Sequence, residues 1–284
     1  MSAAPRKFGW LPEPEGAFDD LTGGRNRDAS EDLLAGAAPA PKEALRLVPH
    51  LPPFKEQGDS STCVGHGILN VGESTLRATT GTKIEPGSIP QVYTTANQLI
   101  EPPGSPLQDI GTYGRVVMHV CKEWGVAPDR IWPFRDPRTG KIDHKRLVTR
   151  VPPDVLMAAS SWKLDEQLTI YATGEDRLRT VDAAIANLSG IPTAGVVDQA
   201  FLDYQGRGVL GAPDPRKFRG RHMVAIIGYR TNAAGRREYL IRNSWRAWGL
   251  VLMNQPSLAW VNEGWVLAQE EMFRLRVSKG RKTA

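Results

Sequence analysis

The chain has 284 residues, of which 40% are hydrophobic and 24% charged, a balance typical of a globular protein with one large domain or two lobes. No apolar run approaches the roughly 20 residues that a membrane-spanning helix needs, so we expect no membrane partner. The net charge of +5 comes from scattered basic residues and a short basic tail at Lys279, Arg281 and Lys282. No aromatic-basic module accompanies this charge, and we therefore expect no nucleic-acid partner.

Two cysteines are too few for a disulfide framework. Cys121 lies on the apolar side of a helical pattern with Val117, Val120 and Trp124, which predicts a core thiol. Cys63 lies among polar residues where a loop meets a helix, which predicts a reactive thiol. The N-terminus has basic residues with no apolar segment behind them, so we expect no Sec signal and a cytoplasmic location, with non-Sec export not excluded.

Residues 1–45 are rich in proline, glycine, alanine and charged residues, and they predict an extended arm or a flexible lead. A short helix is possible from Ser30 to Leu34, but the arm lacks the long amphipathic pattern of an inhibitory pro-helix. The compact domain is predicted to span residues 46–284.

The next predicted element is a helix that begins at Cys63. Val64, Ile68, Val71 and Leu76 follow near-helical spacing. Ser61 or Thr62 is the predicted N-cap, and Gly81 is the predicted end of the helix. In the first helical turn, unpaired N–H groups and the positive end of the dipole would lower the pKa of the thiol.

Further helices are predicted over residues 112–124 and 180–188, the second with Thr180 as its N-cap. The later chain favours strands at residues 192–197, 223–229 and 238–242, with a turn at residues 232–235. Early helices and late antiparallel strands indicate an α+β protein of two lobes. We place the helical lobe at about residues 55–135 and the β lobe at about 136–284.

Four residues in chain order supply the parts of a thiol reaction centre: Gln57, Cys63, His222 and Asn243. A thiol that attacks a carbonyl at neutral pH needs a base, a group that orients the base and a donor to the oxyanion. Each residue alone would be structural more often than catalytic, but the ordered set favours catalysis.

This set resembles that of the papain-like cysteine proteases, most closely bacterial members without disulfides, over about residues 46–275. Further motifs carry the resemblance: Asp109 to Tyr113, Gly125 to Pro128, Trp132 to Phe134, Ile227 to Tyr229, Asn243 to Trp245, Trp248-Gly249 and Glu263 to Trp265, the last resembling the final strand of the family. The opening Phe8 to Pro12 also resembles the lead of such bacterial proteins. The resemblance implies a helical lobe, whose central helix carries the cysteine, packed on an antiparallel β-barrel-like lobe.

The resemblance also implies the role of each residue. Cys63 would be the nucleophile, His222 the base, Asn243 the group that orients His222, and Gln57 an oxyanion donor. Trp245 would shield the His222–Asn243 hydrogen bond, although simple packing explains it equally well. Ile110, Gly111, Arg221 and Met223 would bind substrate. We expect no cofactor and no metal, and we interpret His66 as a structural histidine because no cluster completes a zinc site.

The chain departs from the family pattern around these residues. In the family a cysteine stands three residues before the nucleophile and an aromatic residue directly follows it. Here these positions hold Ser60 and Val64, so a disulfide and an aromatic wall beside the thiol are missing. Met223 replaces a small residue after the base, and we expect it to narrow a substrate pocket. Arg221 places a cation beside His222, and Arg246 replaces a glycine. Residues 250–262 form an apparent insertion.

The sequence therefore predicts a cysteine peptidase that cleaves protein or peptide substrates through an acyl-enzyme intermediate. Two alternatives remain open. One is an amidase, deconjugase or acyltransferase that uses the same Cys and His chemistry, and the other is a binding protein that kept the fold without turnover. Oligomeric state is not predicted.

Overall fold

The computed structural model describes residues 7–35, 41–159 and 162–279. The short helices α1 and α2 and strands β1 and β2 come first, followed by the longer helices α3, α4 and α5. The helices span Asp19–Thr22 (α1), Ser30–Ala35 (α2), Cys63–Thr80 (α3), Ile89–Ile100 (α4), Gly114–Glu123 (α5), His144–Leu147 (α6), Pro153–Met157 (α7), Gly174–Ala186 (α8), Gln199–Leu202 (α9) and Glu263–Leu267 (α10), with 3-10 turns at Val48–His50 and Pro215–Lys217.

The strands belong to one mixed sheet in the described part of the chain. Their bounds are Arg27–Asp28 (β1), Glu43–Ala44 (β2), Trp162–Thr169 (β3), Ile191–Asp198 (β4), Val209–Leu210 (β5), Phe218–Thr231 (β6), Arg237–Arg242 (β7), Leu250–Leu252 (β8), Gln255–Asn262 (β9) and Glu271–Lys279 (β10). The strand order is β1-β3-β10-β4-β6-β7-β9-β5, with β2 beside β6 and β8 beside β9. Strand β10 pairs antiparallel with both β3 and β4, so it links the strand layer under the helices to the rest of the sheet.

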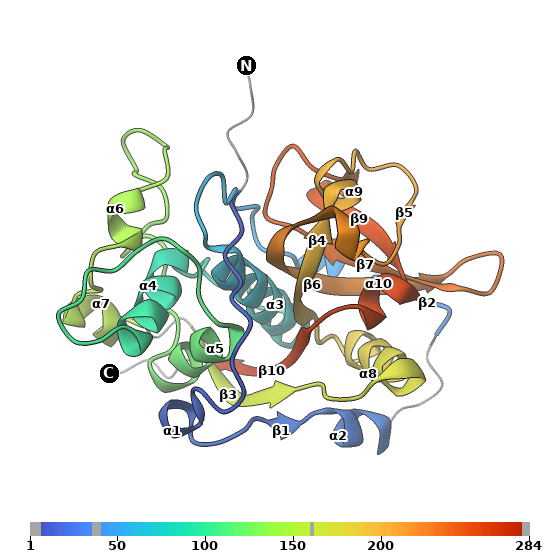
Figure 1. Cartoon of the computed structure of the whole chain (residues 1–284), viewed down its shortest axis with the longest axis horizontal. Coiled ribbons are helices and arrows are strands. Elements are labelled where there is room, and N and C mark those ends of the chain that lie inside the picture. The colour runs from blue at the N-terminus through green and yellow to red at the C-terminus, as the bar shows by residue number, and fades with distance from the viewer. Residues whose placement is uncertain (1–6, 36–40, 160–161, 280–284) are drawn as a thin grey trace.

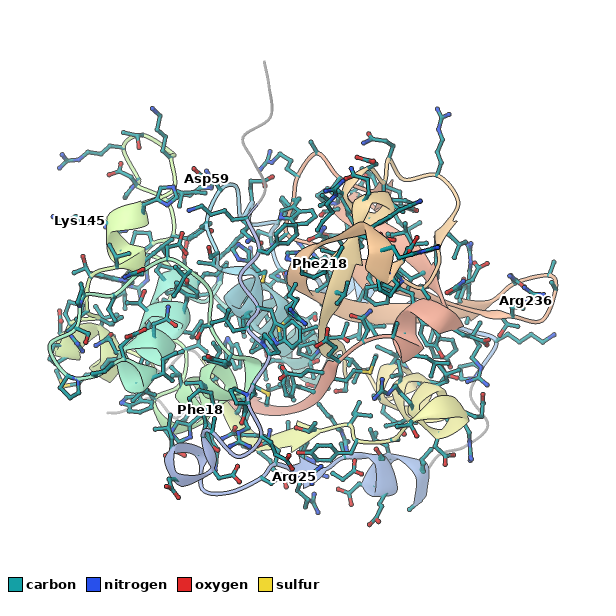
Figure 2. All side chains as sticks on the ribbon, viewed as in Figure 1. Phe18, Arg25, Asp59, Lys145, Phe218 and Arg236 are labelled. Atoms are coloured by element: carbon teal, nitrogen blue, oxygen red, sulfur yellow. The ribbon has the colours of Figure 1, made fainter. Side chains whose placement is uncertain are left out.

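Two lobes lie side by side in Figure 1, helices α3 to α7 in one and most of the strands in the other. Lys145 and Arg236 mark opposite outer ends, and Phe218 lies near the middle (Figure 2). The predicted α+β class is therefore confirmed. Helices α6 and α7, which lie in the predicted β lobe, are seen beside α4 on the helical side.

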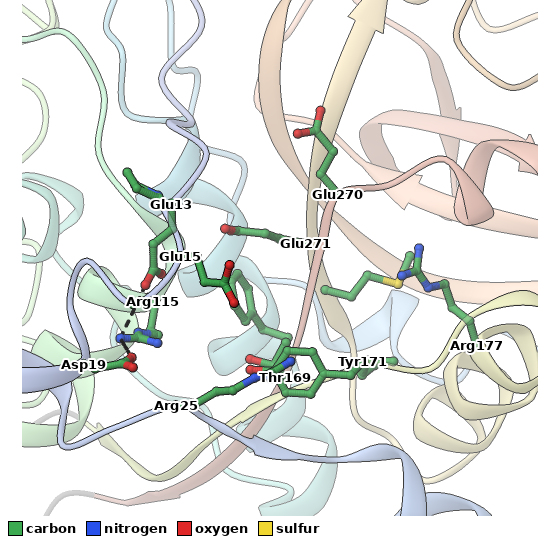
Figure 3. Close-up of a pocket in the computed structure, with 15 residues that line it drawn as sticks. Glu13, Glu15, Asp19, Arg25, Arg115, Thr169, Tyr171, Arg177, Glu270 and Glu271 are labelled. Carbon is green, nitrogen blue, oxygen red and sulfur yellow. Dashed lines mark hydrogen bonds and ion pairs between the residues drawn. The ribbon is translucent and has the colours of Figure 1, made fainter.

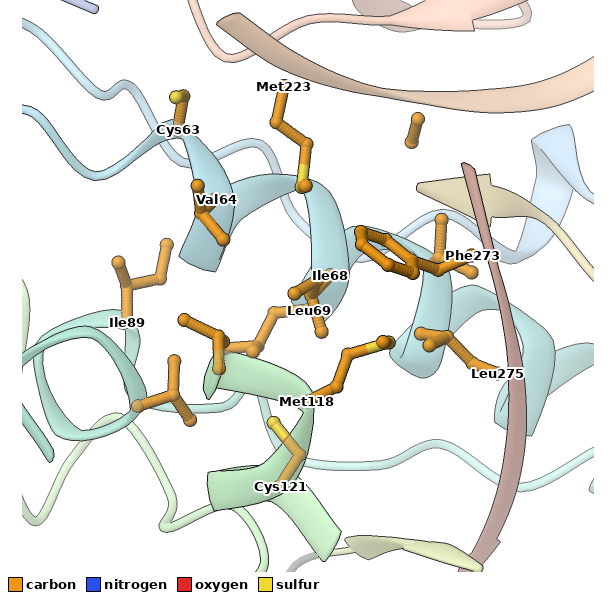
Figure 4. Packing of buried hydrophobic residues seen from close by; sticks show 14 of the residues in the cluster. Cys63, Val64, Ile68, Leu69, Ile89, Met118, Cys121, Met223, Phe273 and Leu275 are labelled. Atoms are coloured by element: carbon orange, nitrogen blue, oxygen red, sulfur yellow. The ribbon is translucent and has the colours of Figure 1, made fainter. Parts of the chain in front are cut away.

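Helix α3 belongs to the helical lobe and packs against β6 of the other lobe, and the sequence predicted its bounds. It begins at Cys63 and ends before Gly81, which is left-handed at φ 63° and donates its N–H to the carbonyl of Arg77. Thr62 occupies the N-cap position without a side-chain cap, because its hydroxyl lies 2.7 Å from Ser60 Oγ instead. Its apolar face joins α4, α5 and residues of β6 and β10 in one core (Figure 4).

Two other local predictions need correction. Helix α8 begins at Gly174 after Thr173 and contains Thr180, because Leu178 extends the buried face toward the N-terminus. The segment that resembled a final strand is helix α10, capped by the side chain of Asn262. The apparent insertion forms β8 and β9, and β9 pairs antiparallel with β7.

The N-terminal arm is not extended throughout. It contains α1, β1 and α2, and β1 pairs in parallel with β3. Trp10 is buried and forms a bridge to Thr112. In Figure 1 the dark-blue arm runs between the two lobes toward α1. The predicted basic residues Arg281 and Lys282 lie outside the described residues.

Candidate active site

Cys63 opens helix α3 at the junction of the two lobes. It is fully buried, and the N–H of Met223 on β6 forms a hydrogen bond that stabilises its thiolate. Gly67, one helical turn later, has no side chain, and a Cβ there would lie 2.7 Å from Met223 Cγ. The absence of a side chain therefore brings the first turns of α3 close to β6, the strand that also carries His222.

His222 and Asn243 meet on the β lobe because β6 and β7 are paired. Asn243 follows directly after the end of β7, and its Oδ1 lies 2.8 Å from His222 Nε2. Trp245 stacks on the imidazole with 4.4 Å between ring centroids and 23° between planes. His222 is only 2% exposed, so water has little access to this hydrogen bond and the low local dielectric strengthens it.

Gln57 lies beside this pair and its side chain has a fixed orientation. Ser244 Oγ donates to Gln57 Oε1 at 2.6 Å, and the Gln57 backbone N–H donates to the Ser244 carbonyl at 2.8 Å. With its oxygen occupied, the amide directs Nε2 toward the carbonyls of Ser60, at 2.7 Å, and Lys7, at 3.3 Å. The amide therefore presents its N–H groups, rather than its oxygen, to these two carbonyls.

The other predicted substrate residues lie in the loop before α5 and on β6. Gly111 is buried at φ 114°, a conformation that glycine tolerates, whereas Ile110 is 58% exposed. Met223 is buried and its side chain lies against Gly67 and Gly114, as seen beside α3 in Figure 4. Arg221 Nε lies 3.6 Å from Glu270 Oε1.

Residues 7–14 cover the centre, and we call them the strap. The carbonyl of Gly9 accepts from the Thr112 N–H at 2.9 Å, and the Leu11 N–H donates to the Thr112 carbonyl at 3.1 Å. The ring of Phe8 makes edge contacts with His222 and Trp245, at centroid distances of 6.2 and 6.1 Å. The strap thus occupies the space beside the thiol, the imidazole and the amide of Gln57.

Glycines on both sides of the strap allow this close approach. A Cβ on Gly9 would lie 1.7 Å from the carbonyl oxygen of Ser61, and one on Gly111 would lie 2.6 Å from the carbonyl oxygen of Gly9. A Cβ on Gly220 would lie 2.4 Å from the ring of Phe8. The fit therefore depends on missing side chains in the strap and in both lobes.

Burial raises the pKa of the Cys63 thiol to about 12. Hydrogen bonds from the backbone N–H groups of Met223 and Gly9 oppose this rise without cancelling it. The predicted lowering of the thiol pKa at the helix N-terminus is therefore wrong for the strap-covered state, because desolvation outweighs the N–H donors. A neutral, covered thiol is a poor nucleophile.

Other predicted features lie apart from this chemistry. Cys121 is buried in the core, and both cysteines are free. His66 is buried on α3, its Nδ1 lies 3.0 Å from the Thr62 carbonyl, and burial lowers its pKa to about 3. Among the described residues no group of histidine, cysteine, aspartate and glutamate could hold a metal ion.

Sequence reasoning missed the roles of Ser244, Asp109 and the strap. Ser244 stands next to Asn243 in the Asn243 to Trp245 motif, so the motif could have indicated a role for its hydroxyl. Asp109 Oδ1 accepts from the Ser61 N–H and from Tyr93 Oη, both at 2.9 Å, and thereby fixes the loop before Gly111. Nothing in the local pattern of residues 7–14 signalled that they lie against Cys63.

Solved structures provide the comparison that identifies the architecture. Xylellain, a cysteine protease from Xylella fastidiosa, superposes with a TM-score of 0.72 at 17% identity, covering 97% of this chain and 98% of its own. Procathepsin B from Trypanosoma congolense gives 0.67 at 13% identity, covering 95% of this chain and 86% of its own. The recombinant stem bromelain precursor gives 0.63 at 19% identity, with 94% and 76% covered.

The chain has a papain-like fold. No protein-family model matches it, and the search of curated proteins found no significant match. The papain-like likeness spans almost the whole chain, so it includes the arm as well as both lobes. None of the described helices combines the length and apolarity needed to cross a membrane.

Proposed function

We propose that the chain is a cysteine peptidase that hydrolyses protein or peptide substrates through an acyl-enzyme intermediate. The observation that carries the proposal is the His222–Asn243 hydrogen bond at 2.8 Å under Trp245, on the strand whose next residue, Met223, donates to the sulfur of Cys63. The fold shared with cysteine proteases supports it independently.

The proposed reaction begins when the strap leaves and water and substrate reach Cys63. Asn243 engages Nε2 of His222, which leaves Nδ1 as the nitrogen that would take the thiol proton. The thiolate attacks the scissile carbonyl carbon, and the oxyanion that forms accepts from Gln57 Nε2 and the Cys63 backbone N–H.

The tetrahedral intermediate breaks down when the proton taken from the thiol is passed to the leaving group. The imidazolium of His222 protonates the leaving amine, the C–N bond breaks, and the acyl group stays on sulfur. Water then attacks the thioester while His222 takes its proton, and hydrolysis releases the acid and restores the thiol. Asn243 orients the imidazole throughout without adding a charge.

Peptide hydrolysis and active-site labelling test the proposal when the strap is displaced. The Gly9→Ala variant serves this purpose because its Cβ would meet the Ser61 carbonyl. We expect this variant to cleave peptides from a mixed library that includes isopeptides, and to react with an epoxide directed at cysteine.

Adding Cys63→Ala should abolish both cleavage and labelling, and adding His222→Ala should lower cleavage by several orders of magnitude. If Cys63 is labelled but only isopeptides are cleaved, the proposed function would be that of a deconjugase instead of a peptidase. A folded Gly9→Ala protein with an accessible but unreactive Cys63 would refute thiol catalysis altogether.

A further inference from the structure

The strap is anchored to the body of the protein through one carboxylate. Trp10 Nε1 donates to Glu271 Oε2 at 2.9 Å, and the backbone N–H of Glu13 also donates to this carboxylate. Both donors belong to the strap, whereas Glu271 begins β10 and is held in the sheet through its pairing with Ala194. Glu271 is therefore the point at which the covering segment meets a fixed strand.

A pocket of about 360 Å³ surrounds this anchor and is rich in charged groups (Figure 3). The strap contributes Glu13, β10 and the residue before it contribute Glu271 and Glu270, and α5 contributes Arg115. Arg115 lies 3.4 Å from Glu13 and 2.6 Å from Asp19, so its charge is shared with two other carboxylates. The remaining charged groups that line the pocket are Glu15, Arg25 and Arg177.

We propose that Glu271 is a proton-controlled latch: its neutral form holds the strap over Cys63, and loss of its proton favours release. The docking equilibrium itself does not depend on the proposed function. Only its consequence, control of access to the nucleophile, rests on the proposed thiol chemistry. The geometry supplies the coupling, because a carboxylate covered by Trp10 and Glu13 gains water when these residues leave.

The direction follows from the cost of burying a charge. In the strap-covered state burial raises the pKa of Glu271 from 4.5 to about 7, and the charges of Glu13 and Glu270 act in the same direction. The Trp10 and Glu13 N–H donors favour the charged form, but burial outweighs them. The pKa of Glu13 is also raised, chiefly by burial, and Arg115 opposes this.

Because the covered state has the higher pKa, it binds the proton more tightly and is favoured at low pH. This contribution is fully present below pH 4.5 and is lost as pH rises through about 7. If release restored a pKa of 4.5 in full, docking would weaken by at most about 70-fold between pH 5 and pH 8. Some burial by β10 and its neighbours persists after release, so we expect about tenfold or more.

The indole resonance of Trp10 tests the latch without using activity. The measurement uses the inactive Cys63→Ala protein, and the indole ¹H–¹⁵N signal of Trp10 is assigned by its loss in Trp10→Phe. Between pH 5 and pH 8 this signal should change toward that of a solvent-exposed indole. The Glu271→Gln variant keeps an oxygen that can accept from Trp10 and cannot ionise, so its signal should stay in the covered position. An unchanged wild-type signal across this range would overturn the proposal.

Labelling of Cys63 provides the functional measurement. At pH 8, Glu271→Gln should react with an alkylating agent at least about tenfold more slowly than wild type, and at pH 5 the two rates should agree. Thiol ionisation affects both proteins alike and cancels in the ratio. Glu123→Gln is the matched control, since Glu123 is exposed at the end of α5 and pairs with Lys122, and it should follow wild type.

The Gly9→Ala background separates the latch from a general structural effect. With the strap already displaced, adding Glu271→Gln should change labelling by less than about twofold at either pH. An equal loss of reactivity with and without the strap would contradict the latch. If the Trp10 signal changes with pH as expected but the strap-free protein cleaves nothing, the latch stands and the proposed peptidase function fails.

Discussion

At the scale of single residues, the proposed chemistry depends on groups that hold other groups in place. Ser244 occupies the oxygen of Gln57 and so decides which end of the amide points toward a substrate carbonyl. Asn243 plays the same part for His222. The two positioning residues are consecutive, so the turn after β7 holds both His222, the proposed base, and Gln57, the proposed oxyanion donor.

We expect Gln57→Ala, in the Gly9→Ala background, to lower kcat by about 100- to 1,000-fold, the usual effect of removing one oxyanion donor. Ser244→Ala should lower kcat by a smaller factor with little change in KM, because the amide remains present but loses its fixed orientation. Steady-state kinetics on one peptide measures both effects. Ser278→Ala, a serine that bonds the exposed Asp165, is the control, and an equal effect there would point to general destabilisation.

At the scale of elements, glycines without side chains set how closely α3 packs against the strands. Gly67 faces Met223 of β6, and a Cβ on Gly72 would lie 2.4 Å from the ring of Trp162 on β3. Because proteins are packed as densely as organic crystals, an added methyl group here must move the indole or the helix. The placement of Cys63 therefore depends on contacts about one turn and about two and a half turns further along its helix.

Gly72→Ala should lower the free energy of unfolding. The gain in helix propensity is about 1 kcal/mol, and the cost of overpacking is about 1–3 kcal/mol, so we expect a net loss of up to about 2 kcal/mol. Urea denaturation with an unchanged m-value would measure it. In Gly211→Ala the new Cβ would lie 3.6 Å from its nearest neighbour, so this control should keep the stability of wild type.

At the scale of the whole molecule, the arm and the two lobes form one closed unit around the thiol. The strap bonds to Thr112 on the helical lobe, touches His222 and Trp245 on the β lobe, and is anchored at Glu271 on the strand that links the two layers. Access to Cys63 is therefore governed by a segment far away in the sequence.

Displacing the strap should restore reactivity to the thiol. We expect Gly9→Ala to raise the rate of Cys63 alkylation at pH 7.5 by at least about tenfold and to bring the thiol pKa below its covered value of about 12, because burial causes that rise. The pH dependence of alkylation followed by mass spectrometry provides both quantities. Pro12→Ala changes an exposed strap residue and should leave the rate unaltered, whereas unchanged labelling in Gly9→Ala would show that the strap does not limit access.

The sequence predicted the parts whose signals are local or fixed by a motif. Apolar spacing and Gly81 were enough to bound α3, and runs rich in strand-forming residues were enough to locate the central parts of β4, β6 and β7. The pairing of His222 with Asn243 was expected from the ordered motif and is present at 2.8 Å. Their catalytic roles remain predictions.

What the sequence could not predict depends on contacts between distant segments. The arm looked extended because its composition offers little apolar periodicity, yet Trp10 is buried through its contacts with Thr112 and Glu271. The prediction of the thiol pKa was wrong for the same reason, since Gly9, which covers the sulfur, lies 54 positions before Cys63 in the chain. The predicted start of α8 was too far along the chain, because Thr180 is as suitable an N-cap residue as Thr173, which occupies that position.

The backbone N–H that Gly9 directs at the sulfur has a consequence for how the covered state would end. An amide hydrogen gives the thiol no carbonyl carbon to attack, so this part of the strap is a poor substrate for the centre it covers. The strap also binds over Cys63 as part of the same chain, and such a tether gives a segment a millimolar effective concentration. A single cut between the strap and α1 would abolish that advantage, and dilution would then keep the freed peptide from returning.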